Sequence, residues 1–117
     1  FINCGVTEQS MMGLAAGLAL AGMKPYVYSM IPFVLFRCYE QLRNDVCYNN
    51  ADVKIIGVEG SIHYKFLGFS HNIVDNEDIS VLSTLPNIKA LIPEDPERLK
   101  DQLETTYNYR SPVYFRI

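Results

Sequence analysis

The stretch FINCGVTEQSMMGLAAGLALAG, residues 1–22, predicts a strand followed by a helix rich in glycine and alanine. Four apolar residues after the strand-like residues 1–4 follow the i, i+3, i+4, i+7 spacing of a helix: Met11, Leu14, Ala15 and Leu18. A single carboxylate, Glu8, stands between the two elements, where an α/β sheet usually binds its ligands. The positive end of the helix dipole favours an ionised Glu8 unless burial opposes it.

Beyond this stretch, strand and helix patterns keep alternating across short connections. Five strands in total predict a doubly wound, mainly parallel α/β sheet with helices on both faces. The loop at residues 60–77 is long enough that we expect it to be functional. The other expected strands are 26–30, 53–58, 88–92 and 113–117, and the other expected helices are 32–48, 78–85 and 96–107.

Length and composition predict one compact domain over residues 1–117, because 49% of the 117 residues are hydrophobic and 20% are charged. The net charge of −3 leaves no basic stripe for nucleic acid. The longest apolar stretch is far short of the roughly 20 strongly apolar residues of a membrane span. Since residue 1 is Phe, we expect a segment of a longer protein whose original ends are missing.

The three cysteines, Cys4, Cys38 and Cys47, lie in apolar segments without CxxC spacing. We expect buried free thiols in a reducing cytoplasm; the alternative is a metal or redox role. No metal ligands are predicted in this chain. In the long loop, His63 is expected to be a solvent-exposed residue.

Several residues with chemical potential follow strands at the same predicted sheet edge: Glu8, Phe33, Phe36, Tyr39 and His71. The three aromatic residues are spaced three apart and cover an arc of about 120° on their helix, so they can form one wall of a pocket. Each feature also has a simpler explanation. The aromatic arc can be core packing, the glutamate a helix-start acid, and the histidine an ordinary loop residue.

The combination of motifs is more specific than any one of them. The pattern Gly5-x-x-Glu8-Gln9, followed by Ala15-Ala16-Gly17, resembles the segment that opens the pyrimidine-binding domain of the transketolase family of thiamine diphosphate enzymes. The resemblance covers essentially the whole chain. It continues through Phe33-x-x-Phe36-x-x-Tyr39, Gly68-x-Ser70-His71, Leu85-Pro86-Asn87, Pro93-x-Asp95 and Pro112-Val113-Tyr114-x-Arg116.

The resemblance implies the thiamine diphosphate-binding fold and a role for each site residue. Glu8 would hydrogen-bond the pyrimidine nitrogen N1′ and so activate the C2 carbon of the cofactor, which requires a pKa raised by burial. Phe33, Phe36 and Tyr39 would form the aromatic wall around the pyrimidine, with Phe36 stacked on the ring. His71 would lie on the substrate side, near the reacting carbonyl.

The chain also departs from the family pattern. Leu67 occupies the position of an aspartate that contacts a substrate hydroxyl in transketolases, and the loop carries an insertion before Glu77-Asp78. The family motif that holds the diphosphate and Mg²⁺ (or Ca²⁺) does not occur in these residues. We therefore expect a separate diphosphate-binding domain of the same or a partner subunit, in a homodimer or heterotetramer. The domain's usual first strand and helix also lie outside this sequence.

The expected function is thiamine diphosphate-dependent transfer of a two-carbon ketol unit between small sugar-like substrates, with the isolated chain inactive. One alternative is a non-catalytic dimerisation domain. Another is a decarboxylating relative of the deoxyxylulose phosphate synthase or 2-oxoacid dehydrogenase β-chain type. The sequence does not name the donor, the acceptor or the pathway.

Overall fold

The computed structural model describes residues 1–60 and 64–117. His63, expected to be exposed, lies outside the described residues. Four strands of the described chain form one sheet in the order β1-β2-β4-β3, and all of their pairings are parallel. The strands are β1 (Tyr26–Met30), β2 (Lys54–Val58), β3 (Lys89–Leu91) and β4 (Val113–Arg116).

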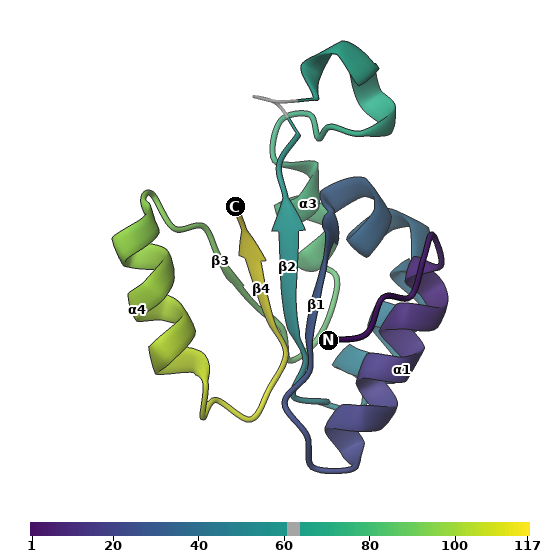
Figure 1. The fold of residues 1–117 in the computed structure, drawn as a ribbon, viewed down its shortest axis with the longest axis vertical. Helices are drawn as coiled ribbons and strands as arrows, with labels where there is room; N and C mark the ends of the chain where they lie inside the picture. The colour runs from purple at the N-terminus through teal and green to yellow at the C-terminus, as the bar shows by residue number, and fades with distance from the viewer. Residues whose placement is uncertain (61–63) are drawn as a thin grey trace.

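The helical elements lie between the strands in chain order. They are α1 (Glu8–Leu20), η1 (Pro32–Arg37), α2 (Tyr39–Gln41), η2 (Leu42–Cys47), η3 (Lys65–Ser70), α3 (Glu77–Leu82) and α4 (Pro96–Thr106). Crossover connections between parallel strands are right-handed, so the direction in which the chain moves across the sheet decides which face the connecting helix covers. From β1 to β2 and from β2 to β3 the chain moves across the sheet in one direction, and from β3 to β4 it moves back. Figure 1 accordingly shows α1 and α3 away from α4, on the other side of the sheet. The predicted doubly wound α/β fold is confirmed.

The hydrophobic core lies between β1, β2 and the helices α1, η1 and η2. Its fully buried members include Met12 of α1, Val34 and Leu35 of η1, and Ile55 of β2. Helix α1 packs against η1 and η2, and its small residues Ala15 and Ala16 are buried in this core. Helix α4 starts at Pro96, and the Asp95 carboxylate accepts a 2.7 Å hydrogen bond from the backbone N–H of Arg98.

The expectation of a strand at residues 1–4 is wrong. This segment has no regular secondary structure, and Phe1 and Ile2 are exposed. Its side-chain hydrogen bonds are local, because the Asn3 side chain accepts from the Gly5 backbone N–H and the Thr7 hydroxyl donates to the Cys4 carbonyl. A strand needs ladder bonds to a neighbouring strand, which apolar pattern alone does not guarantee.

The helix expected at residues 32–48 is present but broken. It starts at Pro32 as predicted, and two π-helical segments flank the short α2. Cys38, with φ −112° and ψ 29°, interrupts the helix between η1 and α2. Wider turns of this kind change which side chains share a face, so the positions predicted from 3.6-residue periodicity shift. The elements α3 and β3 are shorter than expected.

The predicted burial of the cysteines holds for two of three. Cys38 and Cys47 are buried free thiols, whereas Cys4 is only half-buried. In the described part of the chain, no helix is long and apolar enough to cross a membrane.

Candidate functional site

The Glu8 carboxylate is the buried acid of the candidate site. Glu8 is the first residue of α1 and is only 8% exposed. Arg37, the last residue of η1, donates a 2.7 Å hydrogen bond from Nη1 to Glu8 Oε2 and forms an ion pair with it. The two residues are 29 positions apart, so tertiary packing brings them together.

The ion pair reverses the expected electrostatics of Glu8. Burial by itself raises the pKa of Glu8, but the hydrogen bond and charge of Arg37, a bond from the backbone and the Ser29 hydroxyl outweigh it. The pKa of Glu8 is therefore lowered below its usual value, and the sequence-based expectation of a raised pKa is wrong for this state of the protein. Burial and the nearby Glu8 charge raise the pKa of Cys38 to about 12, so its thiol is neutral.

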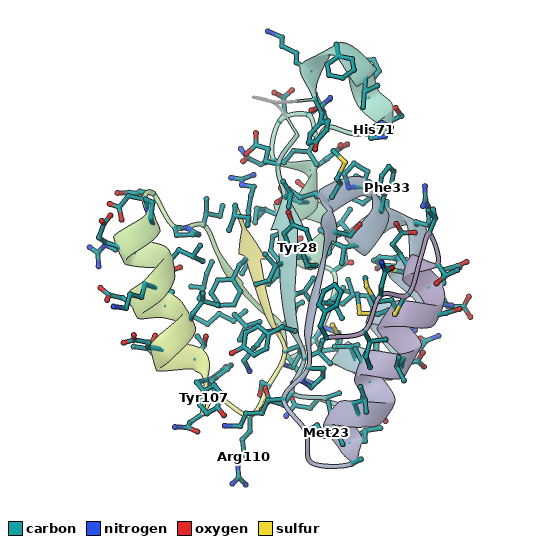
Figure 2. The ribbon with its side chains drawn as sticks, in the orientation of Figure 1. Met23, Tyr28, Phe33, His71, Tyr107 and Arg110 are labelled. Atoms are coloured by element: carbon teal, nitrogen blue, oxygen red, sulfur yellow. The ribbon has the colours of Figure 1, made fainter. Side chains whose placement is uncertain are left out.

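Phe33 joins Glu8 to the histidine loop. The Arg37 guanidinium carbon lies 4.2 Å from the centroid of the Phe33 ring, and the His71 ring meets the same phenyl ring edge-on, with centroids 5.1 Å apart and planes at 79°. Figure 2 shows Phe33 and His71 close together at the end of the sheet where the polypeptide leaves β1 and β2. The array Glu8–Arg37–Phe33–His71 thus runs along the carboxyl edge of the sheet.

The backbone at Gly60 places His71 over this edge. A Cβ atom at Gly60 would lie 2.5 Å from the His71 carbonyl oxygen and 2.6 Å from Asn72 Oδ1, so only glycine allows this approach. The Asn72 side chain donates to the carbonyls of Tyr64 and Gly68, and these two hydrogen bonds within the loop stabilise its conformation. The Ser70 hydroxyl lies 2.7 Å from His71 Nδ1 and orients the imidazole.

The other two residues of the predicted aromatic wall face a different element. Phe36 and Tyr39 line an open hollow of about 520 Å³ with residues of α3 and its end, and the Tyr39 hydroxyl is 2.8 Å from the Thr84 hydroxyl. The structure therefore brings Phe33, but not these two, into the array with Glu8 and His71. Leu67, at the position of the family aspartate, is an exposed residue of η3.

A buried hydrogen-bond network lies between α3 and β4. Asp78 and Tyr114 are fully buried, and the Tyr114 hydroxyl donates a 2.8 Å hydrogen bond to Asp78 Oδ2. Arg116 Nη1 donates to the other carboxylate oxygen at 3.1 Å and lies within 3.9 Å of Glu59 through Nε. These bonds join the start of α3 to β4. Neither this network nor Arg37 was predicted as part of the site.

The contact between Arg37 and Phe33 could have been predicted from the sequence. Arg37 is four residues after Phe33, the spacing at which helical side chains meet. Its pairing with Glu8 had no such signal.

Another hollow lies away from this site. It measures about 640 Å³, lies at the amino ends of the strands, and is lined by Met23, Asp52 and Arg110 among others. Figure 2 shows Met23 and Arg110 at the opposite end of the molecule from Phe33 and His71. Ligands of open α/β sheets bind at the carboxyl ends of the strands, so we assign the site to the Glu8 edge. Across residues 1–60 and 64–117, no cluster of three or more potential ligand side chains could hold a metal ion.

A parallel α/β sheet with a buried acid, an aromatic ring and a histidine on its carboxyl edge is typical of domains that bind a cofactor or substrate there. The family model "Transketolase, pyrimidine binding domain" matches residues 1–117, and the chain belongs to this family.

Individual relatives agree with this assignment. The chain is 38% identical over 116 residues to one of the subunits of the apulose-4-phosphate transketolase of Actinobacillus succinogenes, with 99% of this chain and 37% of the relative covered. It is 32% identical over 123 residues to 1-deoxy-D-xylulose-5-phosphate synthase 2 of Geobacter sulfurreducens, covering 99% of this chain and 18% of that protein. The chain thus spans well under half the length of these curated relatives.

A solved structure shares the fold. A chain described as "Split gene transketolase, inactive beta4 tetramer" superposes with a TM-score of 0.84 at 31% identity, covering 99% of this chain and 36% of the other. The sequence-based assignment to the transketolase family is confirmed.

Proposed function

We propose that this chain supplies the pyrimidine-binding half of the active site in a transketolase-like, thiamine diphosphate-dependent transferase that moves a two-carbon ketol unit between sugar-like substrates. The observation that carries the proposal is the buried Glu8 carboxylate beside Phe33 and His71 at the carboxyl edge of the sheet. Membership of the transketolase pyrimidine-binding family supports the same cofactor.

The residues of this edge fit the pyrimidine ring of the cofactor. Glu8 offers a buried carboxyl group to the ring nitrogen N1′, and the half-buried Phe33 offers an aromatic face. Thiamine diphosphate, when bound, supplies the nucleophilic carbon of the reaction. For Phe36 and Tyr39, contact with the cofactor stays a prediction. His71, oriented by Ser70, would hold or donate a proton at the substrate carbonyl.

The diphosphate and its Mg²⁺ or Ca²⁺ would be held by a domain outside these residues, in the same or a partner subunit. Two relatives that support this are the apulose-4-phosphate transketolase, which is named as a protein of separate subunits, and a split-gene transketolase described as an inactive beta4 tetramer. We propose a homodimer or heterotetramer as the working assembly, with the isolated domain inactive. Free cysteines are consistent with a reducing, cytoplasmic setting.

A second candidate keeps the cofactor but changes the reaction. The 32% identity to a 1-deoxy-D-xylulose-5-phosphate synthase favours a decarboxylating relative, and Leu67 replaces an acid that would contact a substrate hydroxyl in a transketolase. A 2-oxoacid donor that releases CO₂ in the full-length protein, with no ketol transfer from a sugar phosphate, would establish this second reaction.

Replacing Glu8 tests the proposed function. In the full-length protein with its partner, Glu8→Gln should lower kcat about 10²- to 10⁴-fold, because glutamine cannot exchange a proton with the ring nitrogen. Glu40→Gln, at an exposed position of α2, is the matched control and should leave kcat unchanged. Unchanged turnover in Glu8→Gln would refute the role of Glu8.

Replacing His71 tests the substrate side. His71→Ala should lower kcat/KM while the cofactor dissociation constant, measured by calorimetry, stays the same, because the imidazole lies on the loop beyond Phe33. A matching loss of cofactor affinity would contradict a substrate-side role.

A further inference from the structure

The Glu8 carboxylate is held by a residue that does not belong to the expected aromatic wall. The Arg37–Glu8 contact is short, at 2.7 Å, and its two sides differ in exposure. The Glu8 side chain is 9% exposed, whereas the Arg37 side chain is 41% exposed. The carboxylate is thus fixed inside the edge of the sheet, and the guanidinium closes over it from the solvent side.

Arg37 also contacts a second group, the aromatic ring of Phe33. Its guanidinium lies 4.2 Å from the centroid of the Phe33 ring, within the range of a cation–π interaction. Phe33 and Arg37 are one turn apart in η1, so this contact does not depend on Glu8. If the carboxylate exchanges Arg37 for another partner, the guanidinium can stay on the phenyl face.

Arg37 dominates the charge environment of Glu8. The groups that face the carboxylate are Arg37 from η1, the Ser29 hydroxyl from β1, the neutral Cys38 thiol and the backbone at the start of α1. Of these groups, Arg37 alone carries a formal charge. This one guanidinium therefore favours the ionised form of the buried carboxylate and fixes its direction.

We propose that Arg37 is a positioning residue that pairs with the Glu8 carboxylate and aims it in the cofactor-free protein, and that it yields the carboxylate to the ring nitrogen N1′ when the cofactor binds. This inference rests on the proposed role of Glu8. The exchange replaces an ion pair with a carboxyl–nitrogen hydrogen bond that needs one shared proton. Because Glu8 starts ionised, that proton comes from solvent, and Arg37 moves fully onto Phe33.

The exchange has a definite pH dependence. Above the pKa of Glu8 in the cofactor-free protein, binding takes up about one proton, and affinity falls about tenfold for each pH unit. Below that pKa the carboxyl group already carries its proton and the dependence disappears. Removing the Arg37 charge raises the pKa at which this change occurs.

The first test measures Glu8 without cofactor. In the full-length protein labelled with ¹³C at glutamate carboxyl groups, NMR titration gives the Glu8 midpoint, and Glu8→Gln identifies its signal. Arg37→Gln should raise the midpoint by about one unit or more, and Arg37→Lys should restore most of the native value. Arg43→Gln is the matched control, since Arg43 stacks on Tyr48 at 4.6 Å in a similar way on another helix. An unchanged midpoint in Arg37→Gln overturns the proposal.

The second test measures proton uptake on cofactor binding. Calorimetric titration with thiamine diphosphate and Mg²⁺, in buffers of different ionisation enthalpy, counts the protons taken up. At the pH of the Arg37→Gln midpoint, the native protein should take up about one proton more than Glu8→Gln, which gives the contribution of the cofactor's own groups, and Arg37→Gln about half a proton more. Equal uptake by the native protein and Arg37→Gln overturns the proposal. Because the NMR experiment uses no cofactor and no turnover, its failure is distinguishable from failure of the Glu8→Gln activity test.

Discussion

Tyr114→Phe is the change that best isolates one interaction beneath the site. Tyr114 is fully buried in β4, and its hydroxyl donates to Asp78 Oδ2 at the start of α3. Phenylalanine keeps the ring and its packing and removes only the donor. The Asp78 carboxylate stays buried and keeps its bond from Arg116.

The expected cost follows from these contacts. No cavity larger than one oxygen atom is formed, so the packing contribution is small. Losing a buried hydrogen bond to a charged acceptor costs about 1.5–3 kcal/mol. Each 1.4 kcal/mol is a factor of ten, so the opening equilibrium of the β4–α3 contact should rise roughly 10- to 150-fold.

Hydrogen–deuterium exchange of the full-length protein measures this opening locally, without assuming that a large protein unfolds in one step. Peptides covering β4 and α3 should exchange faster in Tyr114→Phe by the same factor. Tyr28→Phe is the control, because Tyr28 lies on β1 and is 65% exposed. Unchanged exchange in Tyr114→Phe, or an equal change in the control, would refute the reasoning.

Two further changes test other buried groups. Lys54 is fully buried, and its ammonium group donates to the Asp52 carboxylate and to two backbone carbonyls. Lys54→Met should therefore lower the free energy of unfolding by about 3 kcal/mol and speed hydrogen exchange at residues 107–112. Lys65→Met, at an exposed position, is the control and should change neither. Burial raises the pKa values of Cys38 and Cys47 to about 12, so iodoacetamide at pH 8 should alkylate the half-buried Cys4 first, as peptide mapping would show. Equal alkylation rates at the three thiols would contradict this.

Most of the fold was predictable because its elements carry local signals. Residues 54–58 form a strand in which every residue is buried or half-buried, as their mostly apolar run indicates. Pro32 and Pro96 start helices at the positions where proline is favoured. The errors fall where a local signal is insufficient. Residues 1–4 lack ladder partners, and the helix at 32–48 contains π turns that an average periodicity does not contain.

The candidate site was predictable in its members but not in its arrangement. Glu8 and His71 do lie at one sheet edge, because both contact η1, the segment that follows β1: Glu8 through Arg37, and His71 through Phe33. The aromatic arc, however, divides between two surroundings: Phe33 meets His71, and Phe36 faces α3. The interruption of the helix at Cys38 and the wide turns before it alter the angles on which the arc was based.

The sequence by itself determined the family, the alternation of strands and helices, and the acid at the start of α1, because these depend on motifs, periodicity and residues adjacent in the chain. Only the tertiary structure decided the state of that acid. Arg37 is 29 residues away from Glu8 in sequence but 2.7 Å away in space, and its charge outweighs the effect of burial. A pKa depends on the charges and solvent around a group, and folding alone brings those together.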